Sequence, residues 1–193
     1  LEYLREHIGR CGTKEGCAEG DCGACTVVLG ELVGEEIRFR AVNACIQFLP
    51  TLDGKALFTV ESLKSRADGT LHPVQRAMVE CHGSQCGFCT PGFVMSLYAL
   101  YRTEREPDER QVRQALSGNL CRCTGYRPIL AAARRMYEYP SGSDSEAALI
   151  KQLADLVQDQ GVAFQSGGVV CLLMPQFVPD RLRLDRARQS SHA

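Results

Sequence analysis

The nine residues Cys17-Ala18-Glu19-Gly20-Asp21-Cys22-Gly23-Ala24-Cys25 place three cysteines in one glycine-rich loop, and a fourth, Cys45, follows further along the chain. This C-x4-C-x2-C spacing with a distant fourth cysteine is that of plant-type [2Fe–2S] sites. The glycines allow positive φ and a close approach of backbone N–H groups to the sulfurs. Two disulfides or a four-cysteine zinc site are alternatives, although zinc sites usually combine two C-x2–4-C pairs and only Cys22/Cys25 has that form.

A second group pairs Cys86-x2-Cys89 with Cys121-x-Cys123. We expect each pair to lie at the start of a helix, whose N-terminus favours an anionic ligand such as a cluster held by thiolates. A four-cysteine zinc site fits this spacing nearly as well as an iron–sulfur cluster does. On spacing alone, the two interpretations remain open.

Composition narrows the classes of protein. The 193 residues carry 22 Lys+Arg against 23 Asp+Glu, which excludes a strongly basic nucleic-acid binder, and 45% apolar residues suffice for a core. No basic start followed by an apolar run is visible, and no stretch is long enough to span a membrane. Eleven cysteines then indicate metal or redox chemistry in a reducing, cytoplasmic setting, without nucleic acid or membrane as partners.

Residues 1–62 form the first expected domain, of α+β class. Leu1 to Ile8 has the pattern of a short amphipathic helix, and strands are predicted over 26–29, 37–42 and 56–60, with a turn region over 30–36. One helix and three strands make a thin core. We therefore expect an N-terminal hairpin, the first strands of this domain, to precede Leu1.

Residues 63–139 form the second expected domain, where the apolar period changes from two to 3.6. Helices are predicted to begin at Pro73, Thr90-Pro91, Asp108 and Pro128, which are residue types that favour helix starts. The short connections predict a compact, all-α four-helix bundle. Cys81 lies on the apolar face of its helix and is expected to be a core thiol, whereas Cys11 and Cys171 have no assigned task.

Residues 140–193 are expected to be a linker and a poorly organised tail. Residues 140–145 have linker composition, 147–157 can form one amphipathic helix, and the pattern deteriorates beyond Gly168. Our hypothesis is a truncated or frame-shifted start of a flavin domain, which the other reading frames of the gene would reveal.

Three long strings carry a resemblance that covers about residues 1–139. Residues 12–27, which include Gly20-Asp21-Cys22-Gly23-Ala24-Cys25, resemble the first cluster motif of the molybdenum hydroxylases. Gly83-Ser84-Gln85-Cys86-Gly87-Phe88-Cys89 and Gly118-Asn119-Leu120-Cys121-Arg122-Cys123 resemble the second. With residues 42–45 and 71–75, the strings are most similar to those of the xanthine dehydrogenases in this family.

The resemblance implies a β-grasp [2Fe–2S] ferredoxin domain followed by a four-helix [2Fe–2S]-binding bundle. The expected iron ligands are the cysteines at 17, 22, 25 and 45 and those at 86, 89, 121 and 123, and Gln85 and Cys123 match positions that approach the pterin. Electrons would pass from a molybdopterin centre through both clusters to FAD and NAD during hypoxanthine and xanthine oxidation, a step of purine catabolism. The chain itself would be an electron-transfer component of an oxidoreductase, with no substrate-converting residue.

Molybdopterin and FAD are then expected on missing or partner regions. The implied partners are a large molybdopterin-binding subunit and a flavin domain or subunit in a hetero-oligomer. Alternatives are the iron–sulfur subunit of an aldehyde, carbon monoxide or N-heterocycle oxidoreductase, a stand-alone ferredoxin-like carrier, and a zinc-binding interaction module.

Overall fold

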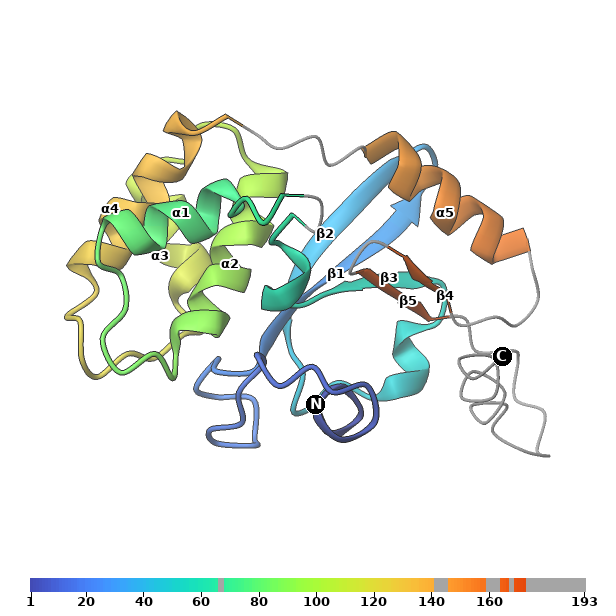
Figure 1. The fold of residues 1–193 in the computed structure, drawn as a ribbon, viewed down its shortest axis with the longest axis horizontal. Helices are drawn as coiled ribbons and strands as arrows, with labels where there is room; N and C mark the ends of the chain where they lie inside the picture. The colour runs from blue at the N-terminus through green and yellow to red at the C-terminus, as the bar shows by residue number, and fades with distance from the viewer. Residues whose placement is uncertain (66–67, 141–145, 159–163, 167–168, 173–193) are drawn as a thin grey trace.

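The computed structural model describes residues 1–65, 68–140, 146–158, 164–166 and 169–172, and combines α-helices with one antiparallel sheet (Figure 1). Four of its elements are short turns of 3-10 or π-helix. The elements in chain order are η1 (Tyr3–His7), β1 (Thr26–Val33), β2 (Glu36–Asn43), η2 (Leu49–Leu52), β3 (Lys55–Phe58), η3 (Val60–Ser62), α1 (Pro73–Glu80), α2 (Thr90–Thr103), α3 (Glu109–Leu116), α4 (Arg127–Arg135), η4 (Met136–Glu138), α5 (Glu146–Gln158), β4 (Phe164–Ser166) and β5 (Val169–Leu172).

The sheet has the order β2-β1-β3-β5-β4, and every neighbouring pair is antiparallel. The three predicted strands are confirmed as β1, β2 and β3. The predicted turn over 30–36 is too long, because β1 continues to Val33 and only Gly34, at φ +65°, and Glu35 separate it from β2. Gly30 fits within the strand because a side chain there would press on Ile37 and Phe58.

Strand β1 is buried on both faces, which explains its uninterrupted apolar sequence. Val28 points into the core that the helices cover, together with Phe39 of β2 and Phe58 of β3. Val27 and Leu29 point the other way, into a smaller core. That smaller core also contains Leu4, Leu52, Leu57, Ala44 and Cys25, so η1 and η2 cover the second face of the sheet.

Helices α1, α2, α3 and α4 pack together on one side of the sheet, with α2 against β1 and β2 (Figure 1). Every residue of α2 from Gly92 to Leu100 is buried. The predicted helix starts are confirmed: His72 caps α1 by accepting a hydrogen bond at Nδ1 from the Val74 N–H, and Asp108 caps α3 by accepting one from the Gln111 N–H.

A single core joins the sheet to these helices. The Tyr98 ring of α2 lies 5.7 Å from the Phe58 ring, 6.4 Å from the Phe39 ring and 5.1 Å from the His72 ring, measured between centroids. The predicted division of the chain near residue 62 therefore does not separate two hydrophobic cores, because the main core contains residues from both sides of it.

The residues after the expected linker contribute more structure than the sequence pattern predicted. The predicted helix over 147–157 is confirmed as α5, whose Leu153 is fully buried in the main core and whose Glu146 pairs with Arg102 at 2.8 Å. The expectation of a poorly organised tail is wrong for β4 and β5, because β5 pairs with β3 and extends the sheet. Residues 173–193 lie outside the described part of the chain.

Of the helices among the described residues, none combines the length and the apolar character that crossing a membrane requires.

Candidate functional site

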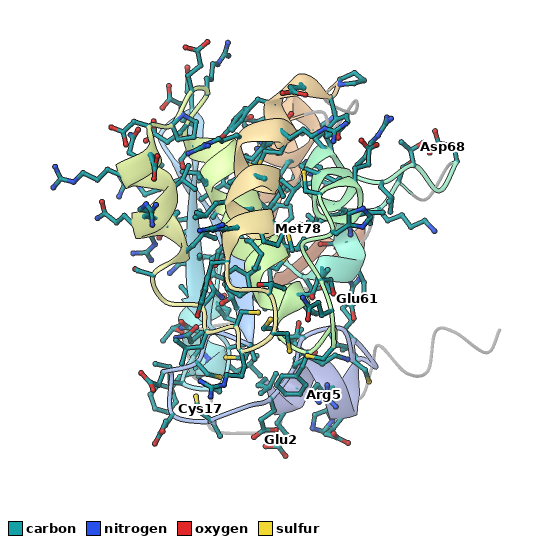
Figure 2. The ribbon with its side chains drawn as sticks, turned by 90° about the vertical axis from the view of Figure 1, so that its left-hand side faces the viewer. Glu2, Arg5, Cys17, Glu61, Asp68 and Met78 are labelled. Atoms are coloured by element: carbon teal, nitrogen blue, oxygen red, sulfur yellow. The ribbon has the colours of Figure 1, made fainter. Side chains whose placement is uncertain are left out.

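The loops that carry both groups of cysteines lie at one end of the molecule, at the lower left of Figure 1. Figure 2 labels Cys17 at this end and shows most of the sulfur atoms gathered near it. The first group occupies the loop before β1 and the segment after β2, and the second occupies the loops before α2 and before α4. A backbone hydrogen bond of 3.0 Å from the Leu120 N–H to the Cys22 carbonyl joins the two groups directly.

Cys17 and Cys22 form one pair of thiols within the first loop. The Cys22 N–H donates to Cys17 Sγ at 3.3 Å, and the Cys17 N–H donates to Cys22 Sγ at 3.4 Å. Backbone N–H groups of Glu19, Cys22 and Asp21 lower the pKa of the Cys17 thiol to about 6. The loop therefore stabilises negative charge on this sulfur, which a metal-ligating thiolate needs.

Cys25 and Cys45 form the second pair of the first group, and their side chains are close enough for each to influence the other's charge. Cys25 directly precedes β1 and is 2% exposed, and burial raises the pKa of its thiol to about 11. The Ala44 N–H donates to the Cys25 carbonyl at 3.2 Å, which brings Cys45 beside the loop. The antiparallel pairing of β1 and β2 therefore brings the fourth cysteine of the group next to the other three.

The expected roles of the loop glycines are confirmed at two positions. Gly20 has φ +82° and Gly23 has φ +70°, a region that glycine enters at little cost. The side chain of Asn43, at the end of β2, donates to the Gly20 carbonyl at 2.6 Å and holds the loop against the sheet. At Gly16, a Cβ atom would lie 2.8 Å from Cys22 Sγ, so only glycine leaves room for the sulfur.

The second group also divides into two pairs of thiols. The side chains of Cys86 and Cys123 lie close enough to influence each other's charge, and so do those of Cys89 and Cys121. The Phe88 N–H and the Cys123 thiol lower the pKa of Cys86, whereas burial raises the pKa of Cys89 to about 12. Each group thus contains one thiol that its backbone favours as an anion and one that burial favours as neutral.

Helix packing positions this second group. Cys89 directly precedes α2 and is its N-cap residue, in place of Thr90, so this pair lies at a helix start as expected, whereas Cys121 and Cys123 lie in a loop that ends at Tyr126, the left-handed N-cap of α4. The Tyr126 hydroxyl accepts a hydrogen bond of 2.9 Å from the Cys121 N–H, and its ring meets the Phe93 ring of α2 edge-on at 6.0 Å. The aromatic contact therefore fixes one loop against the helix that carries the other.

The donor chemistry of both groups fits a two-iron cluster. Four free thiols approach one another as two pairs, with backbone N–H groups directed at their sulfurs. A [2Fe–2S] cluster takes four cysteines from the protein for its two irons, so pairs of thiols satisfy it. Across the part of the chain that the structure describes, no three His, Cys, Asp or Glu side chains are arranged so that they could hold one metal ion.

The remaining residues of interest near the two groups differ in their exposure and in their partners. Gln85 and Cys123, expected near a pterin, are both exposed. Cys81, expected in the core, is half-buried at the end of α1, and His72 serves as the N-cap of that helix. Of the arginines near the second group, Arg122 and Arg127 are exposed, and Arg134 and Arg135 form ion pairs with Glu109 and Glu80.

Sequence reasoning missed two side chains that hold the loops. Arg5 donates from Nη1 to the carbonyls of Cys11 and Thr13, at 3.1 and 2.9 Å, and so ties η1 to the first loop; Figure 2 shows it at the same end as Cys17. Asn119 is 4% exposed between the two groups. A buried asparagine needs polar partners, but those of Asn119 are distant in the sequence, so no local pattern could identify them.

The chain resembles known proteins over its cysteine-bearing part. A family model described as "[2Fe-2S] binding domain" matches residues 59–134. Xanthine dehydrogenase of Drosophila pseudoobscura pseudoobscura is 54% identical over 132 residues, which are 67% of this chain and 10% of that protein. Aldehyde oxidase 2 of Cavia porcellus is 52% identical over 139 residues, 69% of this chain and again 10% of the relative. The chain thus spans about a tenth of the length of these relatives.

Solved structures agree with the mixed architecture of helices and a small antiparallel sheet. Aldehyde oxidoreductase of Desulfovibrio gigas matches with a TM-score of 0.60 and 34% identity, over 80% of this chain and 16% of that one. Quinoline 2-oxidoreductase of Pseudomonas putida 86 matches with a TM-score of 0.58 and 31% identity, over 78% of this chain and 82% of the matched chain. The chain therefore belongs to the molybdenum hydroxylase family and comprises the iron–sulfur, electron-transferring region found in xanthine dehydrogenases and aldehyde oxidases.

Proposed function

We propose that this chain carries two [2Fe–2S] clusters and passes electrons between the molybdopterin and flavin centres of a xanthine dehydrogenase. The ligands would be Cys17, Cys22, Cys25 and Cys45 for the first cluster and Cys86, Cys89, Cys121 and Cys123 for the second. The observation that carries the proposal is the meeting of each group of four thiols as two pairs.

When bound, each cluster would supply one-electron redox chemistry at a metal–sulfur centre. The chain's own residues would hold that centre and adjust its charge. Backbone N–H groups of Asp21 and Cys22 donate to Cys17 Sγ, and that of Thr124 donates to Cys121 Sγ at 3.5 Å. Such hydrogen bonds stabilise the more negative, reduced form and raise the reduction potential.

The proposal extends to the domains and to the partners of the chain. Residues 1–62 would form a β-grasp ferredoxin domain and residues 63–139 a four-helix bundle, which a linker over 140–145 would join to α5. The exposed positions of Gln85 and Cys123 are compatible with contact to a pterin on a large molybdopterin-binding subunit. FAD would lie on a separate domain or subunit, in a cytoplasmic hetero-oligomer that oxidises hypoxanthine and xanthine.

Metal analysis tests the clusters. The whole protein that contains this chain is expected to hold iron and acid-labile sulfide in equal amounts, at two of each per cluster, and to give two distinct paramagnetic signals on reduction. Zinc in place of iron would contradict the proposal and favour a structural interaction module. Iron at half the expected amount would mean that only one of the two proposed sites holds a cluster.

The substrate has a second candidate, an aldehyde. The identity to aldehyde oxidase 2 of Cavia porcellus, 52%, is nearly that to xanthine dehydrogenase of Drosophila pseudoobscura pseudoobscura, 54%. Turnover of the whole protein with xanthine and with an aromatic aldehyde separates the two. Oxidation of xanthine with reduction of NAD is the expected result, and oxidation of the aldehyde alone would assign the chain to an aldehyde oxidase.

A further inference from the structure

Asn119 lies buried between the two groups of cysteines and is hydrogen-bonded to both regions of the chain. Its Nδ2 donates to the Gly23 carbonyl at 3.0 Å and to Thr26 Oγ1 at 3.2 Å, both of which belong to the first region. Its Oδ1 accepts from the Ser96 hydroxyl of α2 at 2.6 Å. Because each end of the amide has a partner in a different region, the side chain fixes the distance between α2 and the first loop.

The backbones of the two loops meet directly beside this side chain. A Cβ atom at Gly23 would lie 2.2 Å from the Gly118 carbonyl oxygen, and one at Gly92 would lie 2.2 Å from the Gly23 carbonyl oxygen. Neither position tolerates a side chain without movement of the backbone. The two loops are therefore as close as their main chains allow.

One hydrogen bond at this contact connects a predicted ligand of each cluster. The Leu120 N–H donates to the Cys22 carbonyl at 3.0 Å, and Cys121 is the next residue after Leu120. The loop between Cys86 and Cys89 reaches the first loop as well, since a Cβ atom at Gly16 would lie 3.5 Å from the Phe88 ring.

We infer that Asn119 is a positioning residue that sets the separation of the two cluster sites, and that the hydrogen bond from Leu120 to Cys22 is the shortest connection between them. The inference rests on the proposed function. In the step concerned, one electron leaves one cluster, which is oxidised, and enters the other, which is reduced; no bond breaks and no proton moves. Electron tunnelling and magnetic coupling both weaken steeply with distance, so a small displacement of one loop affects both.

The Asn119→Ala variant of the whole cluster-loaded protein tests the inference. Ser117→Ala is the matched control, because Ser117 is an exposed residue of the same loop whose hydroxyl donates only locally, to the Gln114 carbonyl. Iron and sulfide content is measured first. Electron paramagnetic resonance of the fully reduced protein then gives the g-values of each cluster and the splitting due to their interaction, and rapid-freeze experiments give the rate of electron exchange.

We expect Asn119→Ala to keep its iron and the g-values of each cluster, to lose most of the interaction splitting, and to exchange electrons several-fold more slowly. Ser117→Ala should match the wild type in all three measurements. An Asn119→Ala protein with full iron, unchanged splitting and an unchanged rate would overturn the inference while leaving the proposed function intact. Failure to find two iron–sulfur clusters in the wild type would instead refute the proposed function.

A second pair of variants decides the matter if Asn119→Ala loses a cluster. Leu120→Pro removes the N–H that donates to Cys22, and Leu120→Ala keeps it while truncating the same exposed side chain. The proline variant should show the weaker coupling and the alanine variant should not. Equal coupling in the two, or a reduced wild-type protein with no interaction splitting at all, would overturn the inference.

Discussion

The two cysteine groups bind the same kind of ligand in the proposed function, yet the chain builds them differently. Three of the first four thiols come from one loop of nine residues, folded by its own glycines and backbone N–H groups. The second four come from two loops more than thirty residues apart, which α2 and α4 bring together. A site built locally can be recognised from spacing, whereas one built by packing cannot, which is why zinc stayed an alternative for the second.

Removal of one proposed ligand thiol from either group gives the largest expected effect. Cys25→Ser and Cys89→Ser each delete a thiol that a cluster requires, so each variant should lose half of the bound iron and the paramagnetic signal of its own site. Cys11→Ser, at an exposed thiol outside both groups, is the control and should keep all of the iron. Retention of both signals in Cys25→Ser would remove that residue from the ligand set.

Truncation of Tyr98 tests whether the two regions unfold separately. The ring is 1% exposed and lies against Phe39, Phe58 and His72, so Tyr98→Ala should lower the free energy of unfolding by about 3–5 kcal/mol. Denaturant titrations followed by circular dichroism and by cluster absorbance should give one coincident transition. Two transitions, with only the helical signal displaced, would show that the regions are independent.

Three glycine substitutions compare two crowded positions with an open one. Alanine usually stabilises a helix relative to glycine, but Gly92→Ala would press on the Gly23 carbonyl and should cost about 1–3 kcal/mol, as should Gly23→Ala. Gly87, at φ +84°, has open space around it, so Gly87→Ala should cost only the backbone strain, about 1 kcal/mol. Thermal denaturation measures all three. Equal losses would mean that the loop contact contributes nothing.

The smallest expected effect concerns a helix that touches neither group of thiols. Asp108→Ala removes the N-cap of α3 and should cost about 0.5–2 kcal/mol without loss of iron. Asp108→Asn keeps an oxygen acceptor and should be close to the wild type in chemical denaturation. Loss of iron from Asp108→Ala would show that the second site depends on the whole set of helices rather than on α2 and α4.

Much of the fold follows from local patterns in the sequence. Strands β1, β2 and β3 and helices α1 to α5 all begin within a few residues of the predicted positions, because alternation, helical period and capping residues are local signals. The prediction failed where contacts between segments distant in the sequence determine the structure. Gly30 suggested a turn but lies within β1, where β2 and β3 supply the neighbours that a turn would lack.

The candidate site likewise combines features that the sequence predicts with features that depend on tertiary contacts. The motif that contains Asn119 can be quoted from the sequence, but nothing adjacent to it indicates that its amide bonds Gly23 and Ser96, because those partners come from other elements. The shared core around Tyr98 is equally invisible to composition and period. The assignment of β5 to the edge of β3 also depends on contacts between distant segments.

The burial of Cys25 leads us to expect an order in time for the maturation of the protein. The residue is 2% exposed, and its neighbours Gly23 and Thr26 accept hydrogen bonds from Asn119 of the helical region. We expect docking of the two regions to hinder a donor of iron and sulfide from reaching that sulfur. Delivery of the first cluster would then precede the docking, during or soon after synthesis of the first region.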